Sequence, residues 1–124
     1  MCTNAVTSIL IVDDETGIRK SFESFFTDHG YNVFSAGTAE KAMHCMEQNK
    51  LDIVIVDLIL PDIGGEELIL KMSCNYPELK FIIHTGSVDF QLSKKLKEIG
   101  LTERNVINKP QTDMNNFIRI MESV

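Results

Sequence analysis

The sequence predicts an α/β protein whose core is a doubly wound parallel sheet of five strands, with helices on both faces. Five short apolar runs recur at intervals of roughly two dozen residues, and segments with helical spacing of apolar residues lie between them. Strand and helix therefore alternate from end to end of the chain. This alternation implies right-handed βαβ crossovers and a single parallel sheet.

The five apolar runs are expected to be the strands. They are bounded by turn residues or charges and are mostly β-branched or aromatic, which is typical of a parallel sheet covered on both faces. In chain order they are Ile9 to Val12, Tyr31 to Ser35, Ile53 to Val56, Leu79 to Ile83 and Asn105 to Ile107. The last run is the weakest of the five.

Helices are expected between and after these strands, because apolar residues recur there at helical spacing. The third helix, about Glu66 to Cys74, is less cleanly amphipathic than the others. The other four apolar series are Ile18, Phe22, Phe25 and Phe26; Ala39, Ala42, Met43 and Met46; Val88, Leu92, Leu96 and Ile99; and Met114, Phe117, Ile118 and Met121. Thr38 and Thr112 can cap helix starts, and Gly30 and Gly100 can end helices in the left-handed conformation.

Length and composition indicate one soluble globular domain over residues 1–124. The net charge of −6 argues against direct binding to nucleic acid or to anionic membranes. No apolar segment is long enough to span a membrane, and the N-terminus lacks the basic flank of a signal peptide. The three cysteines, Cys2, Cys45 and Cys74, form no CxxC motif and suit a reducing compartment. We therefore expect a cytoplasmic protein.

Polar residues end the predicted strands at one edge of the sheet, where ligands of such folds bind. The first strand ends in Asp13 and Asp14, the third in Asp57 and the fourth in Thr85, while the fifth leads to Lys109. Three carboxylates, a hydroxyl and an ammonium group are therefore expected to converge there.

Each acidic residue also has a purely structural explanation. Asp14, Glu15 or Thr16 could simply cap the first helix. Asp57 interrupts the apolar stretch LDIVIVDLILP, where a buried carboxylate is costly unless a cation or donors lie nearby. An ion pair with Lys109 would meet that need without any chemical role.

The three carboxylates together suit a hard divalent cation that keeps several waters, which favours Mg²⁺ over Zn²⁺. Such a cation would remove their mutual repulsion. A carboxylate in this setting can attack a phosphoryl group to form an acyl phosphate, while Mg²⁺, a lysine, a hydroxyl and backbone N–H groups neutralise the phosphoryl oxygens.

Four motifs in chain order resemble those of response-regulator receiver domains of bacterial-type two-component signalling, including chemotaxis regulators. They are VDDE; DLILPDIGGEEL, with Asp57, Pro61 and Gly65 in D-x3-P-x3-G spacing; HTG; and NKP. The resemblance covers about residues 8–124. It implies a flavodoxin-like (βα)5 fold with strand order 2-1-3-4-5, and a single receiver domain without an effector domain in this chain.

The resemblance also implies roles for individual residues. Asp57 would be the phosphoacceptor, and Asp14, Asp57 and the backbone carbonyl of Ile59 would bind Mg²⁺ directly. Asp13 would act mainly through a metal-bound water. The remaining site residues would bind the phosphoryl group through Lys109, the hydroxyl of Thr85 and the backbone N–H groups of Ile59 and Gly86, and Pro110 would follow a cis peptide bond.

Three features depart from the family pattern. Members usually carry an aromatic switch residue three positions before the lysine, where this chain has Val106, so the switch formed with Thr85 lacks its aromatic part. The segment from Gly100 to Lys109 is also about two residues longer than expected. Beside the phosphoacceptor stands Ile59, which cannot orient water, so a long-lived phosphoryl group is expected.

These residues predict a phosphorylation-controlled signalling switch rather than an enzyme with a second substrate. A sensor histidine kinase or phosphotransfer protein would donate to Asp57, and the face of the fourth helix, fifth strand and fifth helix would bind a downstream protein or effector domain. The chain would assist its own phosphorylation and slow autodephosphorylation.

Other classes of protein fit less well. An aspartyl-phosphate phosphohydrolase needs a second acid where Ile59 stands, and a nucleotide-binding module needs a glycine-rich loop after the first strand. The remaining alternative is a receiver-like interaction module that is regulated without phosphorylation, for which Val106 is the main argument.

Overall fold

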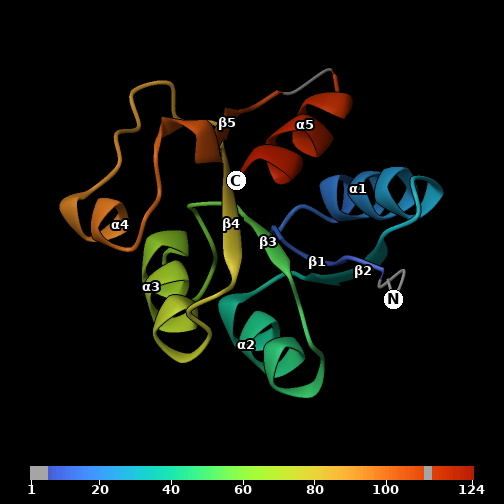
Figure 1. Ribbon diagram of the computed structural model, residues 1–124, viewed down its shortest axis with the longest axis horizontal. Helices are drawn as coiled ribbons and strands as arrows, with labels where there is room; N and C mark the ends of the chain where they lie inside the picture. Colours follow the sequence, from blue (N-terminus) through green and yellow to red (C-terminus); the bar gives the residue numbers. More distant parts are fainter. Residues whose placement is uncertain (1–5, 111–112) are drawn as a thin grey trace, which may run out of the picture.

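The computed structural model describes residues 6–110 and 113–124, whose strands form one parallel sheet (Figure 1). The strands are β1 (Ser8–Val12), β2 (Asn32–Ala36), β3 (Ile53–Val56), β4 (Lys80–Thr85) and β5 (Val106–Asn108). They lie in the order β2-β1-β3-β4-β5, which confirms the predicted doubly wound, flavodoxin-like architecture.

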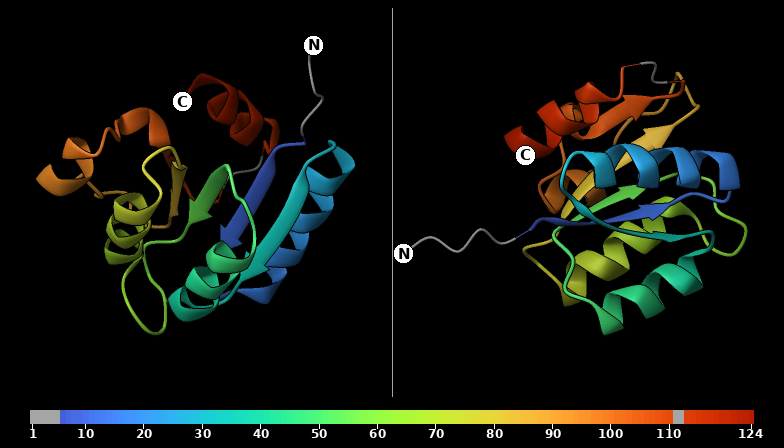
Figure 2. Two further views of the ribbon diagram at one scale, coloured as in Figure 1. Left: turned by 60° about the horizontal axis from the view of Figure 1, so that its bottom comes forward. Right: turned by 90° about the vertical axis from the view of Figure 1, so that its right-hand side faces the viewer.

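Helices cover both faces of this sheet (Figure 2). They are α1 (Thr16–Asp28), α2 (Ala39–Gln48), α3 (Gly65–Asn75), α4 (Lys94–Glu98) and α5 (Asn115–Ser123). Phe26 of α1 and Phe117 of α5 belong to the core on one face, whereas α2, α3 and α4 contribute Met46, Leu68 and Leu96 to the core on the other. None of the helices in the described ranges is long and apolar enough to cross a membrane.

The cover of helices on both faces explains why the central strands are apolar throughout. All residues of β3 are buried, and so are four of the five residues of β1. A strand buried on both faces needs apolar residues at every position rather than alternate ones. The β-branched runs in these two central strands therefore place Asp13 and Asp57 at the first polar positions beyond the core.

The predicted fourth helix is wrong in its first half. The apolar series from Val88 to Ile99 suggested one helix, but α4 begins only at Lys94, after Ser93 accepts a hydrogen bond from the N–H of Leu96 at its start. Val88 is 79% exposed and Ile99 39% exposed, so neither belongs to a buried helical face. Leu92 is buried from a non-helical segment instead, and this burial produced the misleading spacing.

The expected helix ends are largely present. The Thr38 hydroxyl accepts a hydrogen bond from the N–H of Lys41, and Gly30 and Gly100 have φ angles of 89° and 101°. Thr112 lies outside the described residues. Asn105 was expected in the last strand but closes a 3-10 turn (Glu103–Asn105), because its side chain caps that turn with Thr102.

Candidate functional site

The hydrogen-bond ladder of the sheet continues into the predicted site. The N–H of Asp57 donates to the carbonyl of Val12 over 2.9 Å, and the N–H of Lys109 donates to the carbonyl of Thr85 over 2.7 Å. The N–H of Asp13 likewise donates to the carbonyl of Ala36. These bonds tie the backbone of the site residues to the neighbouring strands.

Three carboxylates converge at this edge, as the strand ends predicted. Asp13, Asp14 and Asp57 each offer an oxygen, and these oxygens all lie within 4.8 Å of one another. Asp13 and Asp57 are buried, whereas Asp14 is exposed and faces solvent. An all-oxygen cluster with one open side suits a hard divalent cation such as Mg²⁺, which keeps part of its water shell.

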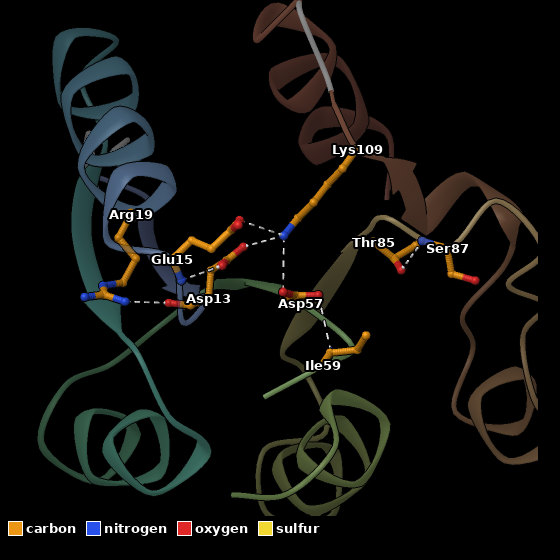
Figure 3. Close-up of polar contacts among 8 residues, drawn as sticks. All are labelled: Asp13, Glu15, Arg19, Asp57, Ile59, Thr85, Ser87 and Lys109. Atoms are coloured by element: carbon orange, nitrogen blue, oxygen red, sulfur yellow. Dashed lines mark hydrogen bonds and ion pairs between the residues drawn. The ribbon is translucent and has the colours of Figure 1, made fainter. Parts of the chain in front are cut away.

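The Lys109 side chain lies among three acidic side chains (Figure 3). Its Nζ is 3.0 Å from Oδ2 of Asp13, 3.2 Å from Oδ2 of Asp57 and 3.5 Å from Oε2 of Glu15. The peptide bond from Lys109 to Pro110 is cis. The ion pair with Asp57, considered above as a structural alternative, is therefore present, but it is shared with two other carboxylates.

Burial and charge act against each other at this cluster. Burial raises the pKa of Asp57 above its ordinary value, although hydrogen bonds from the Ile59 N–H and from Lys109 oppose the shift. Burial alone would lower the pKa of Lys109, but the hydrogen bonds and charges of Asp13 and Asp57 outweigh it and raise that pKa. Lys109 therefore remains an ammonium group and partly neutralises the acids.

Of the predicted phosphate-binding residues, Lys109 and Ile59 contact the Asp57 carboxylate directly. The Ile59 N–H donates to Oδ1 of Asp57 over 3.3 Å, while its side chain is 76% exposed. Thr85 is buried at the end of β4, and its Oγ1 accepts a hydrogen bond from the N–H of Ser87 over 3.0 Å. Gly86, between them, is exposed. In this arrangement the Thr85 hydroxyl is engaged with its own loop rather than with Asp57.

The loop from β1 to α1 does not use its acids as helix caps. Glu15 occupies the cap position of α1, but its side chain makes no capping hydrogen bond. Instead, Oδ1 of Asp13 accepts a hydrogen bond from the N–H of Glu15 over 3.0 Å. The helix-cap explanation considered for Asp14, Glu15 and Thr16 is therefore wrong.

Sequence reasoning missed two contributors to this site. Glu15 shares the ammonium of Lys109, and Arg19 donates from Nη1 to the backbone carbonyl of Asp13 over 2.7 Å. Arg19 stands in the first turn of α1, from which a side chain reaches back over the helix start. Its position near the start of the helix was the one feature of the sequence that could have indicated this role. The expectation that site residues follow strands does not apply to a residue within a helix.

Val106 is half-buried at the start of β5 and packs on the same face of the sheet as α4. It lines a cavity of about 290 Å³ together with Phe90, Leu92 and Asn108. The position at which family members usually carry an aromatic ring therefore borders unfilled space. The aromatic residue that lines this space, Phe90, comes from the loop between β4 and α4.

His84, the residue before Thr85 in β4, is buried among aromatic rings. Its ring lies 5.3 Å from that of Phe22 and 5.2 Å from that of Phe117, between centroids. Within the described part of the chain, neither ring nitrogen has a hydrogen-bond partner. Burial, assisted by the charge of Lys109, lowers the pKa of His84 to about 4.

Comparisons with known proteins agree with this geometry. Residues 9–121 match the family model described as the response regulator receiver domain. The chain is 30% identical to sporulation initiation phosphotransferase F of Bacillus subtilis over 74% of each protein. It is 36% identical to the regulatory protein VanR of Enterococcus faecium over 90% of this chain, which spans only 47% of VanR.

Solved structures agree as well. A response regulator receiver domain from Methylobacillus flagellatus superposes with a TM-score of 0.79 at 25% identity, covering 96% of this chain and 98% of that one. Chemotaxis protein CheY4 of Vibrio cholerae gives a TM-score of 0.86 at 22% identity, covering 97% and 99%, which supports the fold alone. With its carboxylate cluster at the carboxyl edge of a sheet of this order, the chain belongs to the response regulator receiver domain family.

Proposed function

We propose that this chain is a phosphoacceptor receiver domain, in which Asp57 takes a phosphoryl group from a sensor histidine kinase or a phosphotransfer protein. The observation that carries the proposal is the position of Asp57. Its buried carboxylate belongs to the acidic cluster and lies 3.2 Å from Nζ of Lys109 and 3.3 Å from the backbone nitrogen of Ile59. A signalling switch, rather than an enzyme with its own substrate, is the activity of this family.

In the phosphoryl transfer, the residues around Asp57 act by position and by charge. An oxygen of Asp57 attacks the phosphorus atom of the donor phosphohistidine, so that an O–P bond forms while the P–N bond breaks and the electron pair returns to the imidazole. Lys109 and the N–H groups of Ile59 and Gly86 bind the phosphoryl oxygens as charge spreads over them. Lys109 already contacts the oxygen of Asp57, so it needs little movement to follow the phosphoryl group.

Asp14, Asp57 and the carbonyl of Ile59 would hold Mg²⁺ directly, with Asp13 acting through a bound water. When bound, Mg²⁺ supplies positive charge to the phosphoryl oxygens. Asp13 and Asp57 are buried and pre-positioned by the ladder bonds of β1 and β3, while Asp14 stands at the open side where a hydrated ion can enter.

The response to phosphorylation would begin at Thr85. Its hydroxyl leaves the N–H of Ser87, 3.0 Å away, and turns to the phosphoryl group, which frees the loop between β4 and α4. This movement would alter the face formed by α4, β5 and α5, where a downstream protein or effector domain binds. Val106 takes part through packing alone, because it has no ring to rotate.

We also propose that residues 1–124 form a single receiver domain, with its core over about residues 8–124, that acts in the cytoplasm without direct contact with nucleic acid or membrane. The net charge of −6 supports this, because it repels phosphate backbones and anionic lipids. One relative is named a phosphotransferase, and its similarity supports a place in phosphoryl transfer between proteins.

The experiment that tests the proposal is intact-mass analysis after incubation with Mg²⁺ and acetyl phosphate. We expect the added mass of one phosphoryl group, which Asp57→Asn abolishes. The matched control is Asp28→Asn, which removes an exposed carboxylate at the end of α1 and should leave the adduct unchanged. Absence of an adduct in the unsubstituted protein, with this donor and with a phosphorylated histidine donor, would favour the interaction module that is regulated without phosphorylation.

A further inference from the structure

Arg19 contacts the backbone of the acidic loop rather than its carboxylates. It is half-buried in the first turn of α1. Nη1 donates to the backbone carbonyl of Asp13 over 2.7 Å, and Nη2 donates to Oγ1 of Thr16 over 3.2 Å. Figure 3 shows the guanidinium on the side of Asp13 that faces away from Lys109. Arg19 therefore holds the backbone of the loop in place and does not pair with the Asp13 carboxylate.

Two other bonds hold the same short segment. The N–H of Asp13 donates to the carbonyl of Ala36 over 3.1 Å, and Oδ1 of Asp13 accepts from the N–H of Glu15 over 3.0 Å. The carbonyl of Asp13 belongs to the peptide group that leads into Asp14. Arg19 therefore fixes the orientation of the peptide group on which the direction of Asp14 depends.

The side chain of Asp14 depends on the loop backbone for its direction more than those of Asp13 and Asp57 do. Asp13 and Asp57 are buried and hydrogen-bonded, but Asp14 is exposed. Within residues 6–110 and 113–124, no hydrogen-bond donor contacts the Asp14 carboxylate. Its oxygen nevertheless lies within 4.8 Å of those of Asp13 and Asp57. The direction of the Asp14 side chain toward the cluster therefore depends on its backbone.

Gly37, directly after β2, makes room for the guanidinium. A Cβ atom at this position would lie 2.9 Å from Nη1 of Arg19 and 3.4 Å from Cζ. The φ angle of Gly37 is not in the left-handed region, so alanine fits the backbone there. The flexible end of the Arg19 side chain can move away from an added methyl group at a lower energetic cost than the backbone can. Gly37→Ala therefore disturbs the contact without removing the charge.

We propose that Arg19 is a positioning residue for the metal site: by holding the carbonyl of Asp13, it directs Asp14 toward a divalent cation. This inference rests on the proposed function, since it concerns the same site. Groups that orient metal ligands from outside the coordination shell typically change metal affinity by about 10- to 100-fold.

Charge and positioning predict opposite effects on Mg²⁺ binding. The guanidinium is cationic, so on Coulombic grounds its removal should strengthen binding of another cation at the same loop. If Arg19 orients Asp14, its removal should weaken binding. The direction of the change therefore separates the two roles, and a general loss of stability would produce neither pattern when the variants remain folded.

The test is a Mg²⁺ titration of the whole chain, followed by amide chemical shifts, for the unsubstituted protein and for Arg19→Met, Arg19→Lys and Gly37→Ala. The control is Gly17→Ala, which has nothing within 4 Å of the added Cβ. Urea unfolding without Mg²⁺ verifies that each variant is folded. We expect Kd to rise about tenfold for Arg19→Met, to rise less for Arg19→Lys, to rise for Gly37→Ala and to stay unchanged for Gly17→Ala.

An unchanged or lower Kd in Arg19→Met and Gly37→Ala would overturn the proposal. If Arg19→Met does not fold, Gly37→Ala decides alone, because it leaves Arg19 in the chain. If the unsubstituted protein binds no Mg²⁺, both the proposed metal site and the role of Arg19 are wrong. If it binds Mg²⁺ and is phosphorylated on Asp57 while the variants match it, only the role of Arg19 is wrong.

Discussion

Individual side chains set the charge balance of the carboxylate site. The three clustered carboxylates face one ammonium group, from Lys109, which leaves an excess of negative charge. Asp14 is the member of this cluster that is exposed, so its removal disturbs the fewest buried contacts. Its contribution to repulsion can therefore be measured with little loss of packing.

We predict that Asp14→Asn raises Tm in the absence of Mg²⁺ by about 2 °C, because it relieves repulsion among the acids. In the unsubstituted protein, Mg²⁺ at about 100 times its Kd should add about 2.7 kcal/mol to the free energy of unfolding. This gain should be largely lost in Asp14→Asn. Thermal unfolding with and without Mg²⁺ measures both effects, with Asp28→Asn as the control. A lower Tm for Asp14→Asn without Mg²⁺ would show that repulsion is not significant there.

The side chain of Ile59 affects how water can approach Asp57. Its side chain is 76% exposed beside Asp57, yet it offers no hydrogen bond to an incoming water. We predict that Ile59→Asn shortens the lifetime of the phosphoryl group severalfold, because an amide can orient water toward phosphorus. Intact mass followed over time after removal of the donor gives the rate. Ile99→Asn, an exposed aliphatic residue after α4, is the control. An equal or slower loss in Ile59→Asn would contradict this explanation.

Residues of the site were predictable where they end a strand. Asp13, Asp57 and Lys109 follow apolar runs, and the parallel sheet brings such ends to one edge. Arg19 was not predictable in this way, because its role depends on a side chain that reaches back from a helix to a carbonyl. A hydrogen bond to backbone leaves no pattern in residue types.

The start of α3 packs closely against the backbone of Asp57 and Leu58. A Cβ atom at Gly65 would lie 2.2 Å from the carbonyl oxygen of Asp57 and 2.8 Å from Cα of Leu58. The N–H of Gly65 also donates to the carbonyl of Leu58 over 2.8 Å. This close approach is the physical reason for glycine at the end of the D-x3-P-x3-G spacing.

We predict that Gly65→Ala lowers the free energy of unfolding by about 2 kcal/mol, because the methyl group meets backbone atoms that cannot turn aside. The matched control is the preceding residue: a Cβ atom at Gly64 would approach nothing closer than 3.9 Å. Urea unfolding compares Gly65→Ala with Gly64→Ala. Equal stabilities of the two variants would show that α3 moves to accommodate the methyl group.

The elements that sequence reasoning placed well are those whose apolar pattern has a single cause. In β1 and β3, burial on both faces produces unbroken apolar runs, and the strands agree with the prediction to within one residue. Around α4, two causes overlap. Leu96 is buried by the helix, and Leu92 by the loop before it, so the combined spacing imitates a longer helix.

At the scale of the whole molecule, the alternation of strands and helices predicted a parallel sheet, but it could not give the order of the strands. The order 2-1-3-4-5 came from the resemblance of four motifs to a known family, and the structure has that order. It places β1 and β3 side by side, which brings Asp13 next to Asp57 although more than forty residues separate them. Local periodicity contains no information about such pairing.

His84 links the stability of the whole fold to pH. In the folded protein its pKa is lowered to about 4, mainly by burial among aromatic rings, whereas an unfolded histidine titrates near 6.5. Between these values the unfolded chain binds the proton more readily, so acid favours unfolding. The stabilising contribution is complete above about pH 6.5 and is lost as the pH falls toward 4. Its full size is on the order of 3 kcal/mol.

We predict that His84→Leu removes most of this pH dependence, because leucine can fill the space between Phe22 and Phe117 without taking up a proton. Urea unfolding at a series of pH values from about 7 to 4 measures the free energy of unfolding for both proteins. The quantity to compare is its change with pH, since the substitution also alters packing at every pH. His44→Leu, which removes an exposed histidine from α2, is the control. If His84→Leu and the unsubstituted protein lose stability in parallel as the pH falls, the acid sensitivity comes from other groups and His84 is not its source.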